Sequence, residues 1–193
     1  MEKEEVQVFH PKKTAHWRKW LEQHHDEKGA VWLVFYTKTS GKQSITWREA
    51  VDVALCFGWI DSKKIKINKE SSHQFFSKRK TNSTWSKINK QKVEVLIAEG
   101  LMTTAGYQSI ETARRNGSWN ILDEVEELLI PQDLEEELQT KPGSKDFFLS
   151  LSKSVRKAIL QWIVLARKAE TRQKRIHEIA ELAAQKQKPK HLQ

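Results

Sequence analysis

The sequence predicts an α+β fold, in which a small antiparallel sheet packs with helices and a helical module follows. Three observations lead to this fold class. Residues 30–36 form a short aromatic and β-branched run, which is typical of a buried strand. Residues 62–67 alternate apolar residues with lysine at a period of two, as a strand does. Residues 154–166 repeat apolar residues at helical spacing, with basic residues off that face.

Helices are expected on both sides of the first strand. Trp17, Trp20 and Leu21 recur at helical spacing, and Gly29 ends that pattern. Thr46 and Glu49 fit a capping box, in which each side chain accepts a hydrogen bond from the other residue's backbone N–H. The sequence therefore predicts a second, largely apolar helix that begins after Thr46 and ends near residue 58.

A strand pair is expected next. Residues 59–67 and 74–77 are separated by a polar turn, and the first strand should bury one face and expose lysines on the other. Helices are then predicted from about residue 84 to 100 and over 104–115. The remaining chain should be helical, with starts near residues 131, 144 and 154 and a last helix around 176–183.

Composition sets limits on the class of protein. The chain has 193 residues, of which 38% are hydrophobic and 31% charged, and it has one cysteine. That cysteine content argues against a disulfide framework or a cysteine-based zinc site. No apolar run reaches the ~18 residues of a spanning helix, and the charged first five residues are unlike a secretory signal. We therefore expect a soluble, cytoplasmic protein without a transmembrane segment.

The net charge of +9 is unevenly distributed. Residues 1–122 hold 21 Lys and Arg against 13 Asp and Glu, residues 123–146 hold 2 against 9, and residues 147–193 hold 11 against 3. Within residues 63–92 there are ten basic residues and one acid, Glu70. Such a field attracts nucleic acid, an acidic protein or an anionic surface. The alternative is that these lysines only form a solvated surface and bind no partner.

The basic stretch supplies the first candidate site. Cations that neutralise a nucleic-acid backbone and aromatic rings that stack on bases are both present there. Phe75 and Phe76 also interleave with the cations, although these rings and that of Trp85 are alternatively part of the core. The candidate residues for binding nucleic acid or another anion are Lys63, Lys64, Lys66, Lys78, Arg79, Lys80, Trp85 and Lys87.

A second candidate lies at the predicted helix-to-strand junction, at Trp59, Asp61 and Ser62. Asp61 either accepts backbone N–H bonds of the turn or serves a ligand, and a single carboxylate is not a catalytic constellation. We find no phosphate loop, nucleophile elbow or HExxH motif. Cys56 is expected in the core, and His24 and His25 on a solvated helix end. We expect no catalytic residue, no metal and no cofactor.

Several segments together resemble the YdeI/OmpD-associated (OmdA-like) family of bacterial bacteriocin-protection proteins. The resemblance covers about residues 8–120 and 144–185 and depends on short motifs. They are VWLVFYTK (31–38), SGK (40–42), EAV (49–51), ALCFGWIDS (54–62), FSKR (76–79), WSKIN (85–89), GLM (100–102), AG (105–106), ILQWI (159–163), ETR (170–172) and RI (175–176). The resemblance implies a YjbR/CyaY-like antiparallel sheet domain and OmdA-type helices. It also adds Asn89 to Trp59, Asp61 and Ser62 as a candidate family pocket.

The expected domain organisation follows from these observations. We predict an α+β domain over 1–122, an acidic helical connector over 123–143, an OmdA-like helical module over 144–185 and a flexible tail over 186–193. The oligomeric state is left open.

Three functions stay open at this point. The expected one is a non-enzymatic binding protein of stress or bacteriocin tolerance that acts through its basic surface. The alternatives are a sequence-tolerant nucleic-acid-binding protein, and an enzyme or small-ligand binder that uses a pocket near Trp59 and Asp61.

Overall fold

The computed structural model describes residues 6–189, which divide into two compact units. Unit 1 comprises the described residues up to Ser83 together with Ile88–Trp119, and unit 2 comprises Thr84–Lys87 and the described residues from Asn120 onward. The charged first five residues and residues 190–193 of the expected tail lie outside the described part. No helix within residues 6–189 has the length and apolar character needed to cross a membrane.

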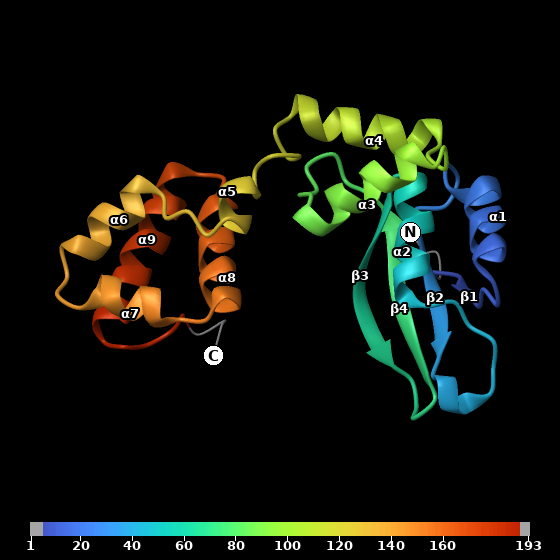
Figure 1. Ribbon diagram of the computed structural model, residues 1–193, viewed down its shortest axis with the longest axis horizontal. Coiled ribbons are helices and arrows are strands. Elements are labelled where there is room, and N and C mark those ends of the chain that lie inside the picture. The colour runs from blue at the N-terminus through green and yellow to red at the C-terminus, as the bar shows by residue number, and fades with distance from the viewer. Residues whose placement is uncertain (1–5, 190–193) are drawn as a thin grey trace, which may run out of the picture. The chain divides into compact units, whose positions relative to one another are not determined.

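Unit 1 contains a four-stranded sheet in the order β1-β2-β4-β3 (Figure 1). β2 (Ala30–Tyr36), β4 (Ser71–Lys78) and β3 (Trp59–Lys66) are antiparallel, as expected. The sheet is nevertheless mixed, because β1 (Val8–Phe9) pairs parallel with β2. A two-residue strand has too little periodicity to be recognised in the sequence. The α+β class is confirmed with this difference.

Four helices belong largely to unit 1. They are α1 (Thr14–His24), α2 (Trp47–Cys56), α3 (Lys87–Ala98) and α4 (Thr104–Arg115). The capping box that opens α2 is confirmed: the backbone N–H of Thr46 donates to Glu49 Oε2 at 2.7 Å, and that of Glu49 donates to Thr46 Oγ1 at 3.3 Å. This cap fixes where α2 begins beside the sheet.

The two faces of the sheet have different environments. Val31, Leu33 and Phe76 are buried on the inner face, where the ring of Phe76 lies 5.6 Å from that of Trp17 on α1. Because side chains alternate along a strand, the neighbouring residues Trp32 and Phe75 point to the opposite, outer face, and both are partly exposed.

The hairpin β3–β4 departs from the expected pattern at its far end. The register shifts between Asp61 and Lys64, which is the mark of a β-bulge. Ile65 and Ile67 were expected on a buried face, but they are 45% and 50% exposed. The register gives the physical reason for Ile65, which lies opposite His73 on the outer face of the sheet, and Ile67 lies past the end of β3, in the turn.

Unit 2 is helical. It contains α5 (Asp123–Glu126), α6 (Gln132–Gln139), α7 (Ser144–Ser150), α8 (Lys153–Val164) and α9 (Ala169–Ala184). These helices share one core, to which the acidic segment contributes Val125, Leu134 and Leu138. Its carboxylates pair with bases of the later helices, as in Asp133 with Arg172.

Candidate functional site

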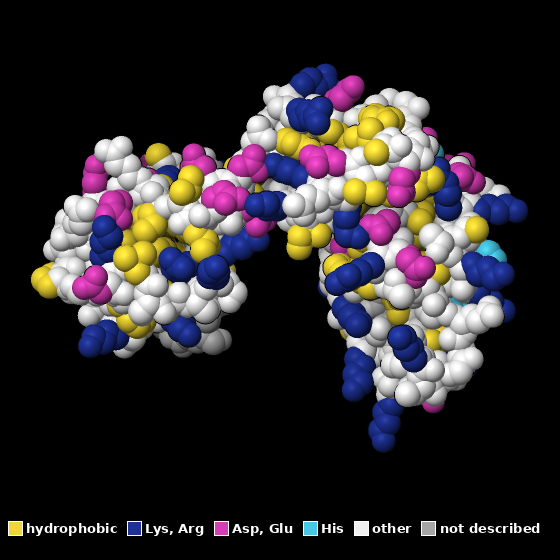
Figure 2. All heavy atoms as spheres, viewed as in Figure 1, with side chains coloured by type: hydrophobic (Ala, Val, Ile, Leu, Met, Phe, Trp, Pro, Cys, Tyr) yellow, Lys and Arg dark blue, Asp and Glu magenta, His cyan; other side chains and the backbone are white. Residues whose placement is uncertain are grey.

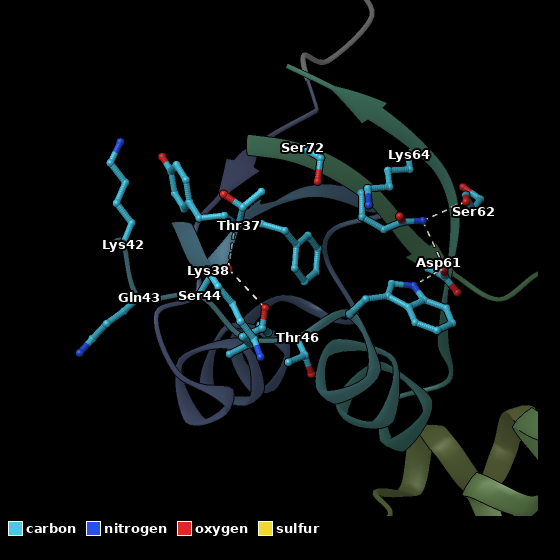
Figure 3. Close-up of a pocket in the computed structure, with 15 residues that line it drawn as sticks. Thr37, Lys38, Lys42, Gln43, Ser44, Thr46, Asp61, Ser62, Lys64 and Ser72 are labelled. Carbon is cyan, nitrogen blue, oxygen red and sulfur yellow. Dashed lines mark hydrogen bonds between the residues drawn. The ribbon is translucent and has the colours of Figure 1, made fainter. Parts of the chain in front are cut away.

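A groove of about 770 Å³ opens on the inner side of the sheet, where α2 begins. It is bounded by the end of β2, the loop from Thr37 to Thr46, the first residue of α2, and inner-face residues of β3 and β4. Figure 3 shows Asp61 and Ser62 at one end of this groove and Lys42 and Gln43 at the other. The volume lies within the ~300–1,000 Å³ of small-molecule sites.

Asp61 organises the first end of the groove. Its Oδ2 accepts a hydrogen bond from Trp47 Nε1 at 2.8 Å and one from Gln74 Nε2 at 3.1 Å. Gln74 also donates from Nε2 to the backbone oxygen of Ser62 at 2.9 Å. A carboxylate, an indole and an amide from three different elements are thereby held in fixed orientations.

The loop that forms the other end is tied to the sheet by its own polar groups. The backbone N–H of Tyr36 donates to Ser44 Oγ at 3.2 Å, and His10 Nε2 lies 2.8 Å from the backbone oxygen of Gln43. Lys42 lies over the ring of Tyr36, with 4.7 Å between Nζ and the ring centroid. Gly41 makes the turn with a φ of 68°, a backbone region that glycine adopts without strain.

The groove contains only part of the family pocket expected from the sequence. Asp61 and Ser62 line it, whereas Trp59 is fully buried among Trp17 and Trp20. Asn89 lies on α3 and is not among the residues that line the groove.

Sequence reasoning missed Trp47, Gln74, Lys38 and Lys42, which also line the groove. One signal for Gln74 was available in the sequence. This polar residue lies two positions before Phe76, so both side chains are on the inner face of the strand, where an apolar residue is usual.

The outer face of the sheet forms a second feature, defined here by Trp32, Lys63, His73 and Phe75. Lys63 Nζ lies 5.2 Å from the ring centroid of Trp32 and 5.5 Å from that of Phe75. The two rings meet edge to face, with centroids 4.9 Å apart. The bulge in β3 brings Lys63 to this face, away from the groove-lining Lys64.

The remaining candidate cations do not share one surface. Lys64, Lys66 and Lys80 are exposed, while Lys78 pairs with Asp26 at 3.4 Å. Arg79 is half-buried, and this burial lowers its pKa to about 10, against the attraction of Asp61; it is therefore protonated at neutral pH.

Trp85 and Lys87 lie in unit 2. Trp85 is 1% exposed, so its ring is not available for stacking on a base. Lys87 Nζ donates to Glu127 Oε1 at 2.7 Å, and this hydrogen bond raises the pKa of Lys87.

Other chemically active side chains have structural surroundings. Cys56 is buried, its thiol donates to the backbone oxygen of Asp52 at 3.3 Å, and burial raises its pKa, which disfavours the thiolate. Within residues 6–189, no three His, Cys, Asp or Glu side chains gather as metal ligands would.

Comparison with known families divides the chain in two. A model described as "Domain of unknown function (DUF8412)" matches residues 9–109, and one described as "Bacteriocin-protection, YdeI or OmpD-Associated" (OmdA) matches residues 127–186. Neither curated proteins nor solved structures gave a match. The YjbR/CyaY-like relationship expected for the sheet domain stays a prediction. The chain belongs to the DUF8412 family of unknown function, and its second unit contains the OmdA domain that the sequence motifs predicted.

Proposed function

We propose that this chain is a cytoplasmic, non-enzymatic binding protein of stress or bacteriocin tolerance, whose outer sheet face binds single-stranded nucleic acid with little sequence preference. The observation that carries the proposal is Lys63 above the partly exposed rings of Trp32 and Phe75. Single strands offer unstacked bases to aromatic rings and phosphates to nearby cations. Sheets with exposed aromatic residues are a known way to recognise such strands.

The charge around this face fits the same ligand. Lys69 continues the cationic run in the turn after β3, and neither Lys63 nor Lys69 forms an ion pair with another described residue. Figure 2 shows Lys and Arg side chains following one another along the β3 side of unit 1. Lysines on an edge strand also discourage pairing with another sheet. That role explains the charges but does not explain why the rings of Trp32 and Phe75 are partly exposed beside them.

The test is a fluorescence-anisotropy titration with labelled single-stranded DNA, single-stranded RNA and duplex DNA. We expect both single strands to bind more tightly than the duplex, and binding to weaken by at least tenfold between about 50 and 200 mM salt. Lys63→Glu should weaken binding at low salt. Trp32→Ala should weaken it by about 5- to 150-fold, the equivalent of ~1–3 kcal/mol for one stacked base, and Trp32→Phe should retain most of it.

Lys19→Glu is the matched control. It makes the same charge change at an exposed position of α1, which packs on the inner side of the sheet. If Lys19→Glu and Lys63→Glu weaken binding equally, the ligand responds only to net charge and the outer face is not its site. If no nucleic acid binds at low salt, the proposal is wrong, and an acidic protein surface becomes the partner to seek.

A further inference from the structure

The groove on the inner side of the sheet has two free acceptor atoms at one end. Gln74 is 5% exposed, and its amide nitrogen donates to Asp61 Oδ2 and to the backbone oxygen of Ser62. Both of these partners are acceptors, which fixes the orientation of the amide and leaves its oxygen as the free atom. Neither Gln74 Oε1 nor Asp61 Oδ1 receives a hydrogen bond from another described residue. A ligand that uses these two oxygens must bring hydroxyl or amino donors.

A flat ring lies beside these acceptors. Trp47 is 49% exposed although its Nε1 is hydrogen-bonded to Asp61, so its indole is oriented before any ligand arrives. Large exposed aromatic rings with a fixed orientation stack on planar rings or on the apolar face of a sugar, at little cost in conformational entropy.

The rest of the groove is cationic. Lys38 and Lys42 line it from the loop, and Figure 3 shows Lys42 at the end opposite Asp61, whereas Lys64 of β3 lies toward the end that holds Asp61. None of the three forms an ion pair with another described residue. The two unpaired lysines of the loop, Lys38 and Lys42, suit a dianion better than a single carboxylate, and a phosphate monoester carries about −1.5 to −2 charges at neutral pH.

We propose that this groove binds a phosphate monoester of a hydroxylated ring compound, with the ring on Trp47, its donors on Asp61 and Gln74, and its phosphate at Lys38 and Lys42. Nucleoside monophosphates and sugar phosphates share this chemistry. The groove lies on the inner side of the sheet and Lys63 on the outer face, so this site is separate from the one proposed for nucleic acid.

Isothermal titration calorimetry of the full chain with AMP, ribose 5-phosphate, adenosine and inorganic phosphate tests the proposal. We expect one molecule of a phosphate ester per chain, with adenosine and inorganic phosphate each weaker by about tenfold or more, because each lacks one of the two recognised parts. AMP binding more tightly than ribose 5-phosphate, with the difference lost in Trp47→Ala, identifies a nucleotide. Equal affinities identify a sugar phosphate.

Variants separate this site from a general attraction of anions. Lys38→Ala combined with Lys42→Ala should weaken AMP or ribose 5-phosphate by about tenfold, and Gln74→Leu should weaken the ester more than inorganic phosphate. Lys19→Ala, and Lys63→Glu on the outer face, should leave the affinity unchanged. Because Lys38 and Lys42 are exposed surface residues, their variant tests the site even if Gln74→Leu fails to fold.

Two results would overturn the proposal. One is the absence of binding by both phosphate esters at millimolar concentration. The other is ester binding that is no tighter than that of inorganic phosphate, or that survives the loss of Lys38 and Lys42. Neither result depends on whether the outer face binds nucleic acid.

Discussion

Gly106 allows α4 to lie close to α2 because it has no Cβ. A Cβ built on Gly106 would lie 2.3 Å from the backbone oxygen of Cys56, far inside van der Waals contact. The same oxygen accepts hydrogen bonds from the backbone N–H of Thr103 at 3.1 Å and from its hydroxyl at 2.6 Å. The start of α4 is thus bound to the end of α2 through one carbonyl, and only glycine at position 106 leaves room for it.

Gly106→Ala should therefore destabilise unit 1 by about 3 kcal/mol, because the new methyl group meets backbone that cannot rotate away. Urea unfolding followed by circular dichroism measures this loss. Gly29→Ala is the control, since its added Cβ would have no neighbour within 4 Å and its φ is not positive. We expect Gly29→Ala to match the wild type or to stabilise it by up to ~1 kcal/mol. Equal stability of the two variants would show that α4 moves freely relative to α2.

At the residue scale the sequence identified Asp61 and Ser62 but not their partners. Their position at the junction of α2 and β3 was predictable, because the helix ended at a glycine and an alternating strand followed. Trp47 and Gln74 were not, because their contacts with Asp61 are made across 14 and 13 residues and depend on strand pairing. The sequence also could not show which of two adjacent rings is buried, because that too depends on strand pairing. Phe75 is partly exposed and Phe76 is buried.

In unit 2, an ion pair joins the acidic segment to the last helix. Arg172 on α9 donates from Nε to Asp133 Oδ2 at 2.6 Å and from a terminal nitrogen to Oδ1 at 2.9 Å. The guanidinium of Arg172 lowers the pKa of Asp133 below its ordinary value of 3.8. This two-point contact connects α6 with α9 and pairs the acidic segment with the basic segment that follows it in the sequence.

Asp133→Asn should lower the free energy of unfolding by about 1 kcal/mol at pH 7, because the pair is partly exposed to solvent. Since the folded-state pKa of Asp133 is depressed, its contribution is complete above pH 3.8 and disappears as the pH falls through the folded value. The stabilities of variant and wild type should therefore converge as the pH falls below 3.8 and through the depressed folded-state pKa.

Urea unfolding at a series of pH values measures the convergence. Glu124→Gln, an exposed acid of α5, is the control and should change little at any pH. A difference between Asp133→Asn and wild type that stays constant down to acid pH would assign the effect to packing and not to charge.

Most helices and strands could be predicted from local sequence patterns. Residues 104–115 were predicted as a helix and form α4, and the capping box placed the start of α2. The bulge in β3 escaped prediction because the alternation of Lys64 to Ile67 continues undisturbed through the sequence. This shift in register determines that Lys63 faces the outer side of the sheet and Lys64 faces the groove. The boundaries of the elements were therefore predictable from the sequence, whereas the face on which each lysine lies was not.

For the whole molecule, two observations indicate separate folding units. The chain clusters into two compact units, and the two family matches end and begin on either side of residue 120, at 109 and 127. Unit 2 has its own core, made by residues from Leu122 to Ala183. The acidic segment shares that core, so its residues belong to the helical unit as much as those of α8 and α9 do.

Differential scanning calorimetry should accordingly show two transitions. Gly106→Ala should lower the temperature of one and leave the other in place, because the substituted site lies wholly within unit 1. Asp133→Asn should lower the second transition alone, because both members of its ion pair lie in unit 2. Hydrogen exchange of the full chain, followed on peptides from each unit as the temperature rises, shows which unit unfolds in which transition. If both variants shift one shared transition by comparable amounts, the units unfold cooperatively, and the outer face and the OmdA helices must then be treated as parts of one folding unit.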